Sequence, residues 1–179
     1  LPWAVGAVRV EIRHQGVLIT ARDASANAPG VTLTAPADGA VLPDGPFLVT
    51  WEGSDLDGDA LSYSLLYSND GGLSWQTLAT GLTEQQLELN TDDLPGGSVM
   101  LRVLVSDGFL SGQDTGAAIT LPTHAPEVQI VLPEADQVFF PTQQVTLQGA
   151  AYDLEDGTLE DAAFVWESSL DGVLGSGAT

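Results

Sequence analysis

The feature that most constrains the fold is an internal repeat with a period of roughly 100 residues. Residues 27–36 read Asn-Ala-Pro-Gly-Val-Thr-Leu-Thr-Ala-Pro, and residues 124–133 read His-Ala-Pro-Glu-Val-Gln-Ile-Val-Leu-Pro. In both copies an apolar segment, an acidic turn, a second apolar segment and an Asp-Gly turn follow in that order. A period of this length corresponds to one β-sandwich domain rather than to one solenoid repeat.

Short strands separated by turns are predicted throughout the first copy. Its densest aliphatic run, 99–105, has the composition of a buried strand and precedes a hairpin-turn signal at 106–109. No stretch shows convincing helical periodicity. Seven strands are predicted, at 31–34, 47–53, 62–68, 74–79, 85–90, 99–106 and 114–120. This pattern indicates an all-β, antiparallel sandwich.

The repeat predicts one complete module flanked by two partial ones. Residues 27–123 are expected to form the complete sandwich. Residues 1–26 are expected to be the C-terminal hairpin of a preceding module, with strands over 5–12 and 17–22. Residues 124–179 are expected to supply only the first strands of a second module, with apolar strands at 145–147 and 164–166. Such partial modules are typical of a piece of a longer chain.

The chain is strongly acidic, with 25 acidic residues, four basic residues and a formal net charge of -21. A nucleic-acid partner is excluded, because affinity for nucleic acids comes mainly from neutralising phosphates. No apolar run approaches the ~20 residues of a membrane-spanning helix, so membrane insertion is not expected. Divalent cations, proteins and neutral glycans remain as partners, although the sequence does not identify the protein or glycan. The simplest interpretation of the acidity is that it keeps the protein soluble in extracellular or salt-rich surroundings.

Cysteine is absent, which excludes disulfides and thiolate metal sites. Small secreted eukaryotic domains are usually cross-linked, so the composition favours a bacterial secreted or cell-surface protein that relies on its core. Leu1 is not an initiator Met, and no basic signal-peptide region precedes it. We therefore expect a mature or excised piece of a longer protein.

Several stretches resemble a known group of modules. Residues 67–75 (Tyr-Ser-Asn-Asp-Gly-Gly-Leu-Ser-Trp), 94–97 (Leu-Pro-Gly-Gly) and 101–108 (Leu-Arg-Val-Leu-Val-Ser-Asp-Gly) resemble the immunoglobulin-like and fibronectin type III-like modules of large bacterial secreted or surface proteins. Residues 151–157 and 174–177 are similar to the next module in such tandem arrays. The resemblance implies an antiparallel immunoglobulin-like β-sandwich, used as a spacer or adhesive repeat.

Asp55, Asp57 and Asp59 are the best candidate metal ligands. They alternate along an acidic turn with Gly58 between the last two, and such oxygen ligands suit Ca²⁺, which takes about six to eight of them. An EF-hand loop would place a bidentate Glu at its twelfth position, where this chain has Leu66. The motif therefore predicts a calcium site that differs from an EF-hand.

A weaker second set occupies the equivalent turn of the second copy and consists of Asp153, Glu155 and Asp156. For both sets the alternative is an ordinary turn in which aspartates bond to the nearby backbone. Repulsion between neighbouring carboxylates favours a bound cation, and no other cofactor is predicted.

Catalysis finds little support in the sequence. His14 and His124 are far apart, and His124, before Ala-Pro at a module boundary, is expected to be a solvated linker residue. The segment from Ser68 to Trp75 matches an Asp-box pattern, which is expected to be a structural turn because Asp70 can accept backbone N–H bonds across it. We therefore expect a protein that is not an enzyme.

The expected function is that of a non-catalytic structural or adhesive module of a larger extracellular protein, with Ca²⁺ as a candidate stiffening ion. One alternative is a carbohydrate-binding accessory module of a secreted hydrolase, which would need exposed aromatic rings. Trp51 and Trp166 are expected in the core, whereas Trp3 lies near the start of the chain. A second alternative is a strand-complemented subunit of an extracellular fibre, in which chains pair head to tail. A third, a peptidase or glycosidase fragment, would need carboxylates beside a histidine.

Overall fold

The computed structural model describes residues 8–178, and the regular structure in that range consists of antiparallel β-strands and two short 3₁₀ turns. The prediction of an all-β antiparallel fold is confirmed. The chain divides into two compact units: one contains the chain up to Asp93 and the segment Gly97–Pro122, and the other contains Leu94–Gly96 and the chain from Thr123 onward. Trp3 and the beginning of the strand predicted over 5–12 lie outside the described residues.

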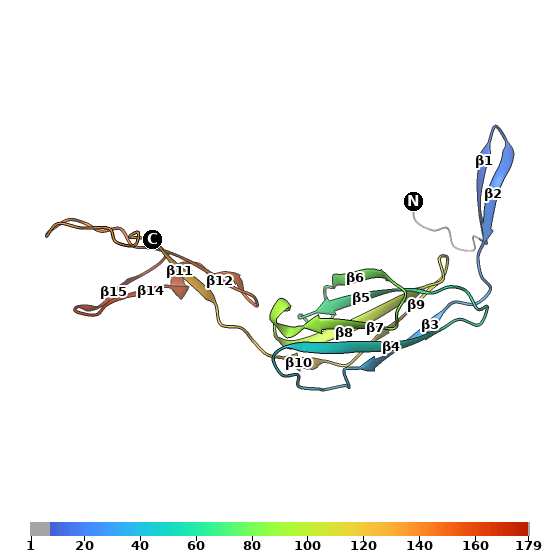
Figure 1. Ribbon diagram of the computed structural model, residues 1–179, viewed down its shortest axis with the longest axis horizontal. Helices are drawn as coiled ribbons and strands as arrows, with labels where there is room; N and C mark the ends of the chain where they lie inside the picture. Colours follow the sequence, from blue (N-terminus) through green and yellow to red (C-terminus); the bar gives the residue numbers. More distant parts are fainter. Residues whose placement is uncertain (1–7, 179) are drawn as a thin grey trace. The chain divides into compact units, whose positions relative to one another are not determined.

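Two sheets form the body of the first unit, and Figure 1 shows their strands. One sheet has the order β3-β4-β7, and its strands are β3 (Gly30–Ala35), β4 (Pro46–Ser54) and β7 (Gln86–Asn90). The other has the order β10-β8-β5-β6, with β9 also paired to β8. Its strands are β5 (Ser62–Ser68), β6 (Gln76–Leu82), β8 (Gly97–Ser106), β9 (Ser111–Thr115) and β10 (Ile119–Leu121). The chain changes sheet after β4, β6 and β7, which is compatible with a β-sandwich.

The core of the first unit lies between these sheets. Alternate residues of β5 and β8 are buried, as expected for strands with one face toward a core. Trp51 of β4 and Tyr63 of β5 come from different sheets, and their ring centroids lie 5.6 Å apart. Both residues are about 2% exposed. This buried aromatic pair therefore makes a contact between the two sheets.

The structure corrects one strand of the first unit. A single strand was predicted over 114–120, but β9 and β10 are separate and pair with different parts of β8. Gly116 lies in the break, where an added Cβ would come within 2.8 Å of Leu33 Cδ2. The side chain of Leu33 on β3 therefore lies close to Gly116, at the point where pairing with β8 changes from β9 to β10.

Before the sandwich, β1 (Arg9–His14) and β2 (Val17–Asp23) form an antiparallel hairpin. Gln15 and Gly16 in its turn have φ values of 49° and 81°, the left-handed conformation that two-residue hairpin turns require. Every residue of β1 is exposed.

The second unit contains five short strands. A three-stranded sheet comprises β11 (Glu127–Leu132), β12 (Gln148–Asp153) and β13 (Gly157–Thr158), and β14 (Val165–Ser168) pairs with β15 (Gly172–Ser176). The strand predicted at 145–147 is wrong, because β12 begins at Gln148. The buried apolar residues of this part of the chain include Ala151 and Phe164.

The repeat is visible in the strand that opens each unit's sheet. β3 pairs with β4, and β11 pairs with β12, both antiparallel and both with a register shift near the end of the first strand. Each opening strand leads into a cis X-Pro bond, at Ala35-Pro36 and Leu132-Pro133. The two copies therefore share local backbone structure. Separately, the described residues contain no helix long and apolar enough to cross a membrane.

Candidate metal site

The acidic loop of the first unit connects β4 to β5 and gathers its carboxylates by local hydrogen bonding. Asp55 Oδ1 accepts the backbone N–H groups of Asp57 (2.8 Å) and Asp59 (3.3 Å). Gly58, between them, has a φ of 76°, which a residue with a side chain rarely adopts. The turn brings one potential ligand atom from each of Asp55, Asp57 and Asp59 within 4.8 Å of the others.

This spacing suits a shared cation. Two oxygens that each lie about 2.4 Å from one Ca²⁺ ion can be at most about 4.8 Å apart. Asp55 Oδ2 is buried and has no hydrogen-bond partner among the described residues. A buried carboxylate oxygen without a partner is costly, and a cation is a partner that would satisfy it. Three protein oxygens leave further positions for water, because Ca²⁺ takes about six to eight ligands.

Asp57 also binds the segment that leads into the sandwich. Its Oδ2 accepts the backbone N–H of Asn27 at 2.7 Å, and its Oδ1 accepts the side-chain N–H of Asn27 at 2.8 Å. These two bonds hold the pKa of Asp57 below its usual value. An ionised carboxylate offers about four acceptor positions, so the bonds to Asn27 leave capacity for a cation. Sequence reasoning placed Asn27 only in a linker and missed this contact.

A second contact on the same segment was also missed. Ser25 Oγ donates to Asp107 Oδ2 at 3.0 Å, and the Arg22 side chain donates to the backbone oxygen of Asp107 at 3.4 Å. Asp107 is 4% exposed, and burial opposes its ionisation. The N–H groups of Phe109 and Leu110 outweigh that effect and lower the pKa of Asp107. The Asp107-Gly108 turn signal thus identified the position but not its partner.

The second acidic loop forms the same hydrogen-bonded turn as the first, but its described carboxylates do not come together at one point. Asp153 Oδ1 accepts the N–H groups of Glu155 (2.9 Å) and Asp156 (3.0 Å), as Asp55 does in the first loop. The side chain of Glu155 instead binds His124 and the N–H of Gly96. Within residues 8–178, no three acidic side chains of this loop meet as those of the first loop do.

His124 is not the solvated linker residue that the sequence suggested. Its Nδ1 lies 2.8 Å from Glu155 Oε1, its backbone N–H donates to the same oxygen at 3.2 Å, and its side chain is only 23% exposed. Burial opposes ionisation of Glu155, but the N–H of Gly96 and the contacts with His124 outweigh it and lower the pKa of Glu155 to about 2. Asp153 adds to this lowering.

The Asp-box segment forms a closed turn. Asp70 accepts bonds from the hydroxyl and N–H of Ser74 and from the hydroxyl of Ser68, and these bonds lower its pKa. Gly72 has a φ of 87°, and its backbone oxygen accepts the indole N–H of Trp75 at 3.0 Å. The polar groups of this segment therefore bond to one another within the turn, as they do in a structural turn.

The three tryptophans that the structure describes differ in exposure. Trp51 is buried, whereas Trp75 and Trp166 are half-buried. The Arg102 guanidinium lies 3.9 Å from the Trp75 ring centroid and covers one face of it. Trp166 donates its indole N–H to the backbone oxygen of Gly177 at 2.8 Å. The predicted burial of Trp51 is confirmed, and that of Trp166 is only partial.

Comparison of the chain with protein-family models, with curated protein sequences and with solved structures found no match. The functional argument therefore depends on the geometry of the described residues.

Proposed function

We propose that this chain is a calcium-stiffened, immunoglobulin-like or fibronectin type III-like spacer or adhesive segment of a larger bacterial extracellular protein, without catalytic activity of its own. The observation that carries the proposal is the position of the Asp55–Asp59 loop. Its carboxylates meet at one point, and one of them also holds the segment that leads into the sandwich. A cation at this point would stiffen the loop beside the linker.

The strand order supports the choice of fold group. In immunoglobulin-like domains, strands C, F and G form one sheet, and strands A, B and E lie in the other. With β3 as strand A, the strands β3-β4-β7 correspond to A, B and E, and β5, β8 and β9 correspond to C, F and G. The remaining strand β6, which pairs with β5, takes the place of an additional strand beside C.

Charge supports calcium as the cation. The chain carries 25 acidic residues against four basic ones, and no basic side chain is paired with Asp55, Asp57 or Asp59 in the described residues. Adjacent carboxylates without such a counter-charge repel one another. Hard oxygen ligands in an irregular loop suit Ca²⁺ better than Mg²⁺, which demands near-ideal octahedral geometry.

Isothermal titration of the chelator-treated chain with Ca²⁺ tests this proposal. We expect saturable binding to the wild type and a loss of affinity of about tenfold or more in Asp59→Asn, which removes a charged ligand. Asp44→Asn makes the same chemical change at an exposed residue outside the loop and should bind as the wild type does. Equal binding by all three proteins, or no binding by any, would contradict the calcium assignment.

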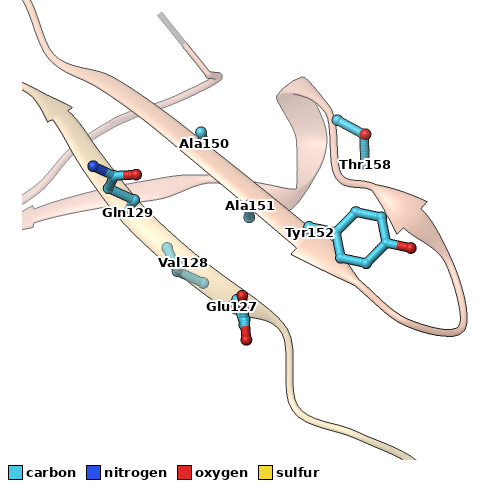
Figure 2. Close-up of a pocket in the computed structure, with 7 residues that line it drawn as sticks. All are labelled: Glu127, Val128, Gln129, Ala150, Ala151, Tyr152 and Thr158. Carbon is cyan, nitrogen blue, oxygen red and sulfur yellow. The ribbon is translucent and has the colours of Figure 1, made fainter. Parts of the chain in front are cut away.

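Self-association is a second candidate, favoured by exposed apolar surface and by the distribution of charge. Val10, Ile12 and Ile19 of the hairpin are 44%, 60% and 61% exposed. An open depression in the second unit is lined by residues of β11, β12 and β13 and includes the exposed Val128 and Tyr152 (Figure 2). A second copy of the chain is the occupant we propose for this surface.

Charge complementarity is the reason for choosing a second copy. The hairpin carries Arg9, Arg13 and Arg22, three of the four basic residues in the chain. Residues 123–179 contain no lysine or arginine. Within the chain, Arg9 and Arg13 pair with Glu11 and Asp23, and Arg22 donates to the backbone oxygen of Asp107. Over residues 9–23 the three arginines still outnumber Glu11 and Asp23. The hairpin of one copy therefore offers exposed apolar side chains and a small positive excess to an acidic, apolar surface of another.

Sedimentation equilibrium over a range of protein concentrations tests the pairing. A rising average mass that falls in high salt and in Arg13→Glu, but persists in Arg13→Lys, would support it. A chain that stays monomeric at the highest concentration would exclude it. A glycan-binding role gains less support, because Trp51 is buried and Arg102 covers one face of Trp75.

A further inference from the structure

Each unit contains a contact of the same kind between its linker segment and its acidic loop. In each, the residue before an Ala-Pro pair bonds to the acidic residue at the third position of that unit's acidic loop. In the first unit this residue is Asn27 and its acceptor is Asp57. In the second unit the residue is His124 and its acceptor is Glu155. Both the backbone N–H and a side-chain nitrogen take part each time.

We infer that the acidic residue at the third position of each loop is a docking site for the chain's own linker, and that its ligand is an extended segment of the form donor residue-Ala-Pro. The site recognises a backbone N–H together with a side-chain nitrogen two residues before proline. We name these two contacts the linker latches. The inference goes beyond the proposed calcium site, because the second latch lies in a loop whose carboxylates do not gather.

The two latches reach the same result with different side chains. The shorter Asp57 uses both oxygens against Asn27, one for the backbone and one for the side chain. The longer Glu155 uses a single oxygen, Oε1, for both the backbone N–H and the ring nitrogen of His124. The donor and the acceptor both differ between the two units, yet each unit has the contact. The units therefore share the pairing of donor and acceptor and not a particular residue.

The residues after the first latch are also fixed in place. Pro29 is buried, and a Cβ added to Gly112 of β9 would come within 2.2 Å of the Pro29 backbone oxygen. Only glycine at position 112 permits this approach. The segment from Asn27 to Pro29 therefore lies against the sandwich at both ends, and the latch supplies its polar contact.

Amide hydrogen exchange measured by NMR on the ¹⁵N-labelled full chain, in chelator, reads the latches directly. The amides of Asn27 and His124 are themselves the latch donors. We expect Asp57→Ala to speed exchange at Asn27 about tenfold or more, the factor for losing a hydrogen bond to a charged acceptor, while exchange at His124 stays unchanged. Glu155→Ala should produce the reverse pattern.

A control readout and one further variant complete the test. The core amides of Leu65 and Val103 should keep their protection in Asp57→Ala, and the amide of the buried Ala151 should keep its protection in Glu155→Ala, which separates loss of a latch from loss of the fold of that unit. The double variant Asn27→His with Asp57→Glu moves the second latch into the first unit and should restore protection at position 27. Wild-type exchange at Asn27 and His124 as fast as in an unstructured peptide would overturn the inference, as would an Asp57→Ala change that leaves Asn27 unaffected.

Discussion

At the scale of single residues, a glycine allows the backbone of one sheet to lie close to a side chain of the other. Gly53 on β4 lies against the ring of Tyr63, and a Cβ added there would come within 2.1 Å of the Tyr63 hydroxyl. Tyr63 is about 2% exposed and packs against Trp51, so the ring has little freedom to move away. The contact between the two sheets therefore depends on glycine at position 53.

Gly53→Ala should destabilise the first unit by about 1–3 kcal/mol, the usual cost of overpacking a filled core. Gly30→Ala is the matched control, because nothing lies within 4 Å of its added Cβ and its backbone is not left-handed. Urea unfolding followed by tryptophan fluorescence measures both. If the two variants unfolded at the same urea concentration, this account of the Gly53–Tyr63 contact would be wrong.

Glu155 gives the second unit a dependence on pH. Its pKa of about 2 in the folded chain lies below the ordinary value of 4.5, so its ionised form stabilises the fold at neutral pH. That contribution should be complete above about pH 4.5 and should be lost as the pH falls toward 2. Because many carboxylates titrate in this range, the informative quantity is the difference in stability between the wild type and Glu155→Gln.

We expect this difference to be largest near neutral pH and to shrink as the pH falls from about 4.5 to about 2. Chemical unfolding at a series of pH values, followed by the amide NMR signals of residues in the second unit, would measure it. A difference that stayed constant across this range would show that the charge of Glu155 does not stabilise the unit.

At the scale of elements, the strands follow the alternation of the sequence. In β5 the side chains of Tyr63, Leu65 and Tyr67 are buried, whereas Ser64 and Leu66 between them are only partly so. Leu65 and Leu66 are chemically identical neighbours on opposite faces of one strand. They therefore separate the effect of facing the core from the effect of residue type.

Leu65→Ala should destabilise the sandwich by about 2–5 kcal/mol, because it leaves a cavity in a filled core. Leu66→Ala should cost clearly less, since its side chain already contacts solvent. Thermal unfolding monitored by circular dichroism would rank the two. Equal losses of stability would indicate that β5 does not present one face to the core.

Much of the first unit could be predicted from this alternation and from turn residues, since both are local properties. The strands predicted over 62–68 and 85–90 lie close to β5 and β7. The break between β9 and β10 could not be predicted, because the part of β8 with which each strand pairs is a long-range property that a local apolar run does not specify. The start of β12 at Gln148 was missed for a related reason: a short apolar run does not specify where pairing with β11 begins.

The candidate site also has one part that local sequence predicts and another part that it does not. The spacing of Asp55, Asp57 and Asp59 was enough to predict that they meet, because one turn brings them together. The partners Asn27 and His124 are 30 and 31 residues away from their carboxylates. The repeated Asn/His-Ala-Pro pattern was the one sequence signal that pointed to them. Its polar residue was interpreted as part of a linker, although an exposed linker would not need a hydrogen-bonding side chain at the same place in both copies.

At the scale of the whole molecule, the chain consists of two compact units that share one local design. In each unit an extended strand pairs with the next, an acidic turn follows, and the carboxylate at its third position holds the segment before the first strand. Among residues 8–178, only the first unit gathers three carboxylates. A cation would therefore stiffen the first unit selectively.

Thermal unfolding in chelator and in millimolar Ca²⁺, with Mg²⁺ at matched ionic strength, tests the central claim most directly. At a concentration about 100 times its dissociation constant, Ca²⁺ should add about 2.7 kcal/mol and raise the unfolding temperature by several degrees. Asp59→Asn should lower the rise by about half or more, as a tenfold or greater loss of affinity requires, whereas Asp44→Asn should retain it. A rise produced equally by Mg²⁺, or no rise in the wild type, would contradict the account and leave the Asp55–Asp59 loop as an ordinary turn.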